Sequence, residues 1–260
     1  MKKHLSILLT IILALALLTP QTALAGSYAS TIWDIHSSFV SGNRKADSAP
    51  QQQVNGAYRC VELLEVWAYQ VGVASSTVSS IHSSYVSGNR KADSAPQQLA
   101  NGLYRCVELL EAIALKYGCN YSSVSDIHSS FTSGNRKANS AVQQQVNGAY
   151  RMVELLELIA LKIGCTYSSV SDVHSSFTSG NRRAESAPQQ LANGNYRAVE
   201  LLELIAIKLG CSYSDVSSIH SSFSSGNRSA KSAVQQSVNG LYRSVELLEL
   251  IVLKLDSGII

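Results

Sequence analysis

Five histidines are the first residues of this sequence whose type and spacing suggest chemistry. Each stands in the motif Ile/Val-His-Ser-Ser-aromatic and follows the previous one by 46 residues: His36, His82, His128, His174 and His220. Imidazole is a common metal ligand, so one interpretation is a ladder of metal sites. Stacked helical units, however, place equivalent positions about 10 Å apart, too far for two imidazoles to share one ion. We therefore favour histidines that hydrogen-bond to a neighbouring helix, and we expect no metal and no cofactor.

A second repeated group combines a tyrosine, an arginine and two glutamates. In the third copy these are Tyr150, Arg151, Glu154 and Glu157. Paired carboxylates can perform acid–base catalysis, but an arginine three residues from Glu154 keeps such a pair ionised. We interpret the group as a ladder of ion pairs between adjacent long helices and predict that the protein is not an enzyme.

The motif Ser-Gly-Asn-Arg gives the strongest candidates for binding. Its polar residues are Asn43, Arg44, Asn89, Arg90, Asn135, Arg136, Asn181, Arg182, Asn227 and Arg228. They precede the start of a predicted helix, where free amides and the helix dipole favour anions. We expect these loops to line one edge of the molecule and to bind a repetitive polar ligand, a glycan or an anion. The alternative is a structural turn.

The elements that must position these groups follow from the repeat itself. All the motifs recur with the same period and no insertion, which divides the chain into repeats at 29–74, 75–120, 121–166, 167–212 and 213–260, after a short segment at 26–28. A fixed period of this size is typical of helical repeat arrays, in which each unit buries its apolar face against its neighbours. We predict an all-α fold: a right-handed α-solenoid of five two-helix repeats, each with a short and a long helix.

The third repeat shows the predicted helices most clearly. Ser123 and Asp126 resemble a capping box at the start of the short helix, and Ser140 with Gln143 resembles another at the start of the long one. The long helix runs to Gly164. Within it lies Gly148, whose cost of about 1 kcal/mol relative to alanine predicts a close approach of another helix. In the first repeat, Trp33 and Trp67 replace smaller residues, and we expect them to shield the first helices of the array.

Residues 1–25 have the features of a secretory signal peptide. Two lysines precede an apolar run, and the segment ends in the small-residue sequence Ala23-Leu24-Ala25. The run is too short to span a bilayer, so we expect cleavage before Gly26 and a periplasmic or secreted protein. Removing this segment lowers the formal net charge from +3 to +1. A nearly neutral chain favours neither nucleic acid nor an anionic membrane as partner.

Five cysteines in an exported chain raise the question of disulfides. Cys60 and Cys106 share one repeat position, and Cys119, Cys165 and Cys211 share another. Equivalent positions about 10 Å apart exceed the roughly 7 Å that a disulfide allows between Cα atoms. We therefore expect small, buried, unpaired side chains.

The last repeat has no polar capping helix, whereas open repeat arrays need polar ends. We expect it to contact the first repeat of another chain, or a different protein. The sequence thus predicts an exported, non-enzymatic scaffold or protein-interaction module that associates with a protein partner or with itself end to end.

Overall fold

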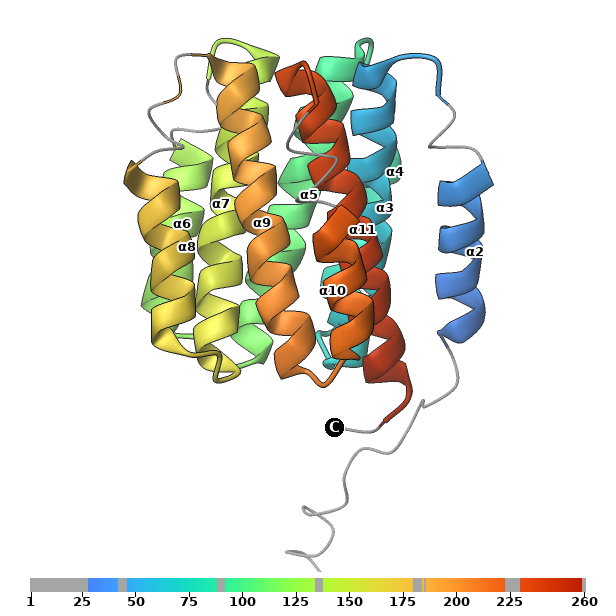
Figure 1. Cartoon of the computed structure of the whole chain (residues 1–260), viewed down its shortest axis with the longest axis vertical. Coiled ribbons are helices and arrows are strands. Elements are labelled where there is room, and N and C mark those ends of the chain that lie inside the picture. The colour runs from blue at the N-terminus through green and yellow to red at the C-terminus, as the bar shows by residue number, and fades with distance from the viewer. Residues whose placement is uncertain are drawn as a thin grey trace, which may run out of the picture.

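The computed structural model describes residues 28–41, 46–87, 92–133, 138–179, 184, 186–222 and 230–258. These residues form ten helices and no strand, which confirms the all-α prediction (Figure 1). The long helices are α3 (Ala49–Gln70), α5 (Ala95–Lys116), α7 (Ala141–Lys162), α9 (Ala187–Lys208) and α11 (Ala233–Asp256). The short helices are α2 (Ala29–Ser41), α4 (Ser75–Ser87), α6 (Tyr121–Ser133), α8 (Tyr167–Ser179) and α10 (Tyr213–Ser222).

Each long helix begins and ends at the residues expected from capping. Ser140 Oγ accepts a hydrogen bond from the Gln143 amide at 3.2 Å. At the other end Gly164 has a φ of +91°, a conformation that glycine adopts without strain. The Cys165 amide donates back to the Ala160 carbonyl at 2.9 Å, which closes the last turn. These local bonds fix the length of α7 at 22 residues.

The short helix of the third repeat begins three residues earlier than predicted. Helix α6 starts at Tyr121, and the Asn120 side chain accepts the Ser122 amide at 2.9 Å. Asparagine is among the best N-cap residues, so Asn120 takes the position that the sequence had suggested for Ser123. The correction matters because it makes Tyr121 the first helical residue.

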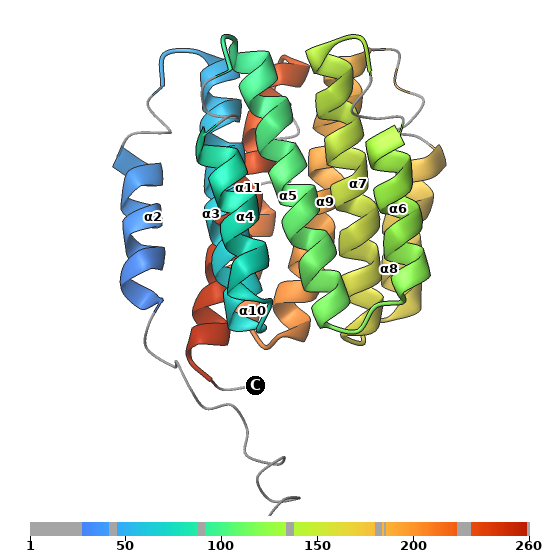
Figure 2. The same ribbon diagram turned by 180° about the vertical axis from the view of Figure 1, so that it is seen from behind.

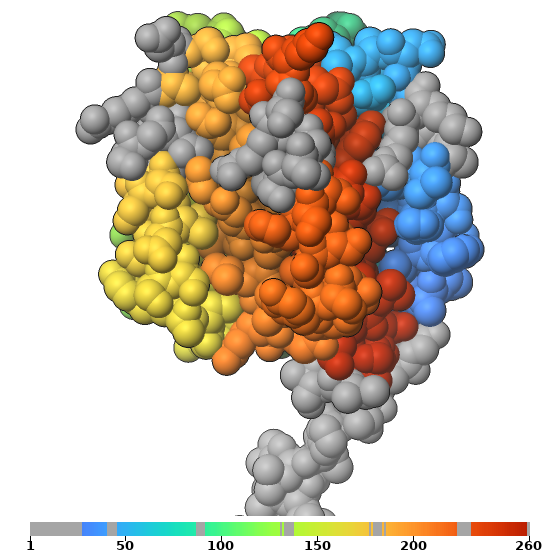
Figure 3. All heavy atoms as spheres, viewed as in Figure 1, coloured from blue at the N-terminus to red at the C-terminus, as the bar shows by residue number. Residues whose placement is uncertain are grey.

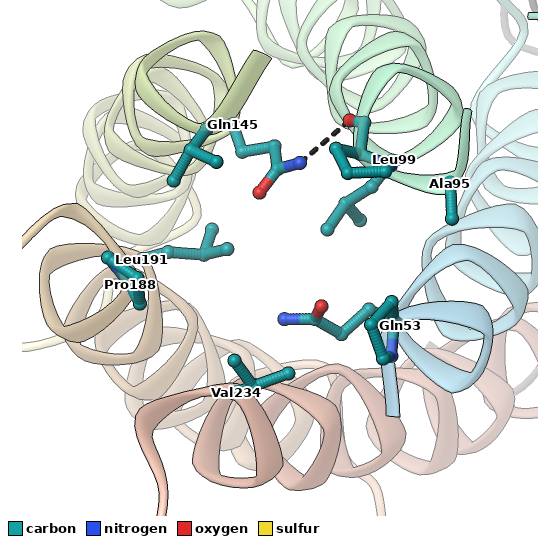
Figure 4. Close-up of a pocket in the computed structure, with 10 residues that line it drawn as sticks. Gln53, Ala95, Leu99, Gln145, Pro188, Leu191 and Val234 are labelled. Carbon is teal, nitrogen blue, oxygen red and sulfur yellow. Dashed lines mark hydrogen bonds between the residues drawn. The ribbon is translucent and has the colours of Figure 1, made fainter. Parts of the chain in front are cut away.

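The five long helices form a closed ring. Each packs against the next, from α3 to α5, α7, α9 and α11, and α11 packs against α3. Their broad apolar faces meet both neighbours, so side chains such as Val61, Val107 and Val153 have no exposed surface. The view along the ring in Figure 4 shows the long helices around a common centre.

Ring closure corrects the expectation of an open array with two ends. The apolar face of α11, which the sequence suggested as a contact for another chain, is covered by α3 of the same chain. The last repeat has no polar cap because the first repeat takes that place. The face of α11 that the sequence suggested for end-to-end association is thus occupied within the chain.

Glycines inside the long helices allow the close packing that the sequence predicted. A Cβ atom placed on Gly148 would lie 3.0 Å from Leu103 Cβ on α5. The same holds where the ring closes, since a Cβ atom on Gly56 would lie 3.1 Å from Leu241 Cβ on α11. The five glycines thus set the distance between long helices at every contact around the ring.

The short helices form an outer layer (Figures 1 and 2). Each lies in the groove between two long helices; for example, α4 contacts α3 and α5, and α2 contacts α11 and α3. They bury few residues, such as Val78 and Val124, and expose the rest. This layer surrounds the ring of long helices and presents many polar side chains to solvent.

The two tryptophans have different environments. Trp67 is fully buried, and its Nε1 donates a hydrogen bond to the Tyr117 hydroxyl at 3.1 Å. Trp33, in contrast, is 67 % exposed on α2. The prediction that both shield the first helices is wrong for Trp67, because a closed ring has no first helix to shield and the side chain fills the core.

Candidate functional site on the outer face

Each motif histidine contacts a glutamate on the long helix that precedes its own repeat. His82 Nδ1 lies 3.0 Å from Glu65 Oε2, and His128 Nδ1 lies 2.9 Å from Glu111 Oε2. The same contact recurs as His174 with Glu157, His220 with Glu203 and His36 with Glu249. The histidines thus tie each short helix to the preceding repeat. Among the described residues, no group of three or more His, Cys, Asp or Glu side chains could hold a metal ion.

The arginines pair within their own helices. Arg151 Nη1 contacts Glu154 Oε2, and Arg59 Nη1 contacts Glu62 Oε2 in the same way. The other three repeats contain the same pair, three residues apart. Each arginine thus pairs with a glutamate along its own helix, and the other glutamate of the repeat pairs with a histidine of the outer layer. The ladder between adjacent long helices stays a prediction.

The glutamate that contacts the histidine in each repeat, such as Glu65 or Glu203, is largely buried. Burial raises the pKa of Glu65 above its ordinary value, while the charge and hydrogen bond of His82 lower it. Burial also raises the pKa of Glu203, and His220 opposes that rise. Each of these carboxylates thus faces a histidine from the next helix, an arrangement that links repeats.

The Asn and Arg residues proposed from the sequence as the binding edge all lie outside the described residues. They are the ten residues of the Gly-Asn-Arg loops at positions 43, 44, 89, 90, 135, 136, 181, 182, 227 and 228. The ends of the flanking helices place each loop between a short helix and the start of the long helix of the same repeat.

Large exposed aromatic side chains mark a surface that the sequence did not reveal. Tyr121, Tyr167 and Tyr213 are 73–75 % exposed, and each is the first residue of its short helix. Trp33 lies one helical turn further along on α2, four residues beyond the equivalent position. These four residues, which we call the aromatic arc, come from α6, α8, α10 and α2, successive helices of the outer layer.

The arc interrupts the symmetry of the ring. Helix α4 carries Ser75 at the position of the tyrosines and Ser79 at the position of Trp33. Four sectors of the outer layer therefore present an aromatic ring and the fifth presents hydroxyls. Figure 3 shows α8, α10 and α2 standing out from one face of the molecule, with α9 and α11 visible between them.

Exposed aliphatic side chains accompany the aromatic arc. Leu115, Leu161 and Ile207 lie near the ends of α5, α7 and α9 and are 39–44 % exposed. Leu253 of α11 is exposed as well. A four-residue turn joins the end of each of the first three helices to the next short helix, so these side chains and the tyrosines share one end of the ring.

Trp33 borders a shallow pocket at the closure of the ring. The indole stacks on the His36 imidazole, with ring centroids 5.4 Å apart. Together with Leu250 and Leu253 of α11 it lines a mostly apolar hollow of about 280 Å³. The hollow can accept an apolar side chain.

No helix in the described part of the chain combines the length and apolar character needed to cross a membrane. No family model, no curated protein and no solved structure matches this chain.

Proposed function

We propose that this chain is an exported, non-enzymatic helical-repeat protein that binds a protein partner through the aromatic arc and so acts as a scaffold module. In this proposal the five units wind as one right-handed solenoid turn whose ends meet. The observation that carries it is the exposure of Trp33, Tyr121, Tyr167 and Tyr213 on successive outer helices. Tyrosine and tryptophan are enriched in protein interfaces and supply most of the energy at their centres.

The neighbours of the aromatic residues favour a protein over a carbohydrate. Aromatic rings alone can stack on sugars, but Leu115, Leu161 and Ile207 add aliphatic surface at the same end of the ring. Exposed aromatic and aliphatic side chains that gather at one end of a molecule are typical of protein interaction sites. The pocket beside Trp33, with Leu250 and Leu253, offers a place for one anchoring side chain of the partner.

The test compares two sets of serine variants. In the first, Tyr121, Tyr167 and Tyr213 are replaced by serine, the residue that α4 carries at this position. In the second, Val40 and Val86, which are exposed at the opposite ends of α2 and α4, are replaced by serine. Both proteins are used to capture partners from the native envelope or medium, and a photo-crosslinker at position 167 identifies what touches the arc.

The expected result is a protein that crosslinks at position 167, is captured by the Val40/Val86 variant, and is lost with the tyrosine variant. Equal capture by both variants, with no crosslink at position 167, would refute the proposal.

The alternative function, binding of a glycan or anion through the Gly-Asn-Arg loops, has its own variant. Replacing the five loop arginines by alanine should leave capture of the arc's partner unchanged. Loss of binding to an immobilised glycan or polyanion in this variant, with no effect of the tyrosine replacements, would favour the loops.

Export is tested separately. Expression of the full chain followed by cell fractionation and N-terminal sequencing should yield a mature protein that begins at Gly26 and lies outside the cytoplasm. An intact N-terminus in the cytoplasm would contradict this part of the proposal.

A further inference from the structure

A cavity lies on the axis of the ring, at the end where the five long helices begin (Figure 4). Its volume is about 140 Å³. The second residue of each long helix forms the rim of the cavity. This residue is proline in three repeats and valine in the other two, at Val142 and Val234. One turn deeper the lining residues are Gln53, Leu99, Gln145 and Leu191.

Below the lining residues of the cavity, the same face of α3 is fully buried. Steps of four, three and four residues from Gln53 lead along one face of α3 to Ala57, Cys60 and Leu64, which are at most 1 % exposed. Above them, proline and valine side chains are too small to meet at the centre of five helices. The space is therefore a consequence of the ring geometry combined with the residues at two positions of each repeat.

Two buried amides project into this otherwise apolar space. Gln53 and Gln145 are 6 % and 5 % exposed, and Figure 4 shows both pointing into the cavity. Gln145 Nε2 donates a hydrogen bond to the Pro96 carbonyl at 2.7 Å. The Gln53 amide, in contrast, makes no hydrogen bond to any described residue of the chain. A donor that faces a cavity and has no protein partner is free to bond an acceptor placed there, and such a bond typically contributes about 0.5–1.5 kcal/mol.

The size of the cavity limits the ligand to a small molecule. An apolar cavity of about 150 Å³ in another protein holds a benzene molecule, so a six-membered ring with one substituent fits here. The leucines, prolines and valines of the lining match an apolar body. The Gln53 Nε2 group matches a single hydrogen-bond acceptor on that body.

The electrostatics decide between a neutral and a charged acceptor. Five helix N-termini surround the mouth, and their dipoles favour negative charge. A carboxylate inside the cavity, however, would lose its hydration and gain only uncharged amide donors, and desolvation of an ion outweighs a dipole effect of this size. The balance favours an uncharged carbonyl.

We propose that the axial cavity is a binding site for a small, uncharged, mostly apolar molecule whose carbonyl oxygen accepts a hydrogen bond from Gln53. The site is separate from the aromatic arc, and its occupation does not depend on the proposed protein partner.

The test uses three probes that differ in one group: cyclohexanone, methylenecyclohexane and cyclohexanecarboxylate. Binding to the mature protein is followed by NMR, from the methyl signals of Leu99, Leu191, Val142 and Val234. Cyclohexanone should shift these signals and bind about three- to tenfold more tightly than methylenecyclohexane, the range that one hydrogen bond provides. The carboxylate should bind most weakly.

Two matched variants assign the effect to Gln53. Gln53→Leu places the residue of the second and fourth repeats in the first, and it should abolish the preference for the ketone. Gln145→Leu removes an amide that already has a partner, and it should retain the preference. Val142→Phe fills the mouth from the partly exposed first turn of α7 and should abolish the shifts with every probe.

Three outcomes overturn the proposal. One is the absence of shifts at these methyl groups at the solubility limit of all three probes. Another is tighter binding of the carboxylate than of the ketone, and the third is an equal ketone preference in Gln53→Leu. Circular dichroism of each variant establishes that a lost shift does not come from a lost fold.

Discussion

His36 Nδ1 lies 3.0 Å from Glu249 Oε2, although 213 residues separate them along the chain. The same contact joins His82 to Glu65 across only 17 residues. The closing contact of the ring is therefore chemically identical to the contact between consecutive repeats. The first and last repeats meet through interactions that every repeat already contains.

Aromatic contacts repeat this relationship in the core. Phe39 of α2 packs edge-on against Tyr242 of α11, with ring centroids 5.0 Å apart. Tyr85 of α4 packs against Tyr58 of α3 in the same way, at 5.1 Å. The first and last repeats thus behave as sequence neighbours, which explains why neither carries a polar capping helix.

Substitution of the interhelical glycines tests ring closure directly. Gly56→Val should destabilise the protein as much as Gly148→Val, because a Cβ atom would meet Leu241 in one case and Leu103 in the other at nearly equal distances. Overpacking of this kind costs typically 1–3 kcal/mol. Chemical denaturation of both variants measures the two losses.

An open array predicts a different result for Gly56→Val and Gly148→Val. There Gly56 would face solvent, and Gly56→Val would change the free energy of unfolding little, while Gly148→Val would still destabilise. Gly56→Ala and Gly148→Ala provide the milder matched pair. Unequal losses within these pairs would contradict closure of the ring in solution.

Deletion of one repeat should be far more damaging here than in an open array. Without residues 121–166, four units would have to span the angle that five units cover, and the contact between α11 and α3 would be strained or lost. We expect loss of cooperative unfolding or association into larger closed assemblies, observed by denaturation and light scattering. A stable monomer with a proportionately smaller unfolding enthalpy would indicate an open array.

The repeat boundaries, the two helices of each unit and the helix caps at Ser140 and Gly164 follow from local sequence patterns. Local patterns cannot decide whether five units close. The interface between repeats is the same in an open and a closed array, and closure depends on the small rotation between adjacent units. That rotation is set by packing at positions such as Gly148. The sequence predicts that another helix approaches Gly148 closely, but it does not give the angle between the two helices.

The candidate site was harder to predict than the fold. The sequence predicts that the histidines hydrogen-bond to a neighbouring helix, and spacing allows the Arg151–Glu154 pair along one helix. Spacing does not show that His174 lies across from Glu157. Tyr121 was missed because the helix was expected to start at Ser123, which would have left the tyrosine in a turn. The amides at Gln53 and Gln145 gave no signal, since a common axis exists only after closure.

The five cysteines are unpaired in the structure, and their burial predicts two classes of reactivity. Burial raises the pKa of Cys60 to about 12 and that of Cys106 well above its ordinary value. Cys119, Cys165 and Cys211 are half-buried; burial raises the pKa of each thiol, and a nearby lysine opposes the rise. Because the thiolate is the reactive form, the three half-buried thiols should react first with a disulfide reagent at pH 8.

Two sets of substitutions verify the assignment. Replacement of the three half-buried cysteines by serine should remove the fast phase. Replacement of Cys60 and Cys106 by alanine, the residue at this position in the fourth repeat, should remove only the phase that requires unfolding. Fewer than five thiols after denaturation would reveal a disulfide and contradict the structure.

The buried glutamates predict how stability changes with pH. Burial raises the pKa of Glu203 above its ordinary 4.5, an effect that His220 reduces and Glu200 reinforces. A carboxyl whose pKa is raised in the folded state favours folding while protonated, and this contribution is lost as the pH rises through the folded pKa. Glu203→Gln cannot ionise, so its free energy of unfolding relative to the native protein should increase from pH 4 to pH 7.

The dependence on His220 makes this test specific. Glu65→Gln should show the same trend, because burial is also the largest cause of the raised pKa of Glu65. In a His220→Asn background the hydrogen bond and charge that lower the pKa of Glu203 are absent, so the increase should extend to higher pH. Urea unfolding of five proteins at several pH values gives the differences: the native protein, Glu203→Gln, Glu65→Gln, His220→Asn and the double variant His220→Asn/Glu203→Gln. A difference between Glu203→Gln and the native protein that is constant with pH, or that decreases, would show that burial does not control this carboxyl.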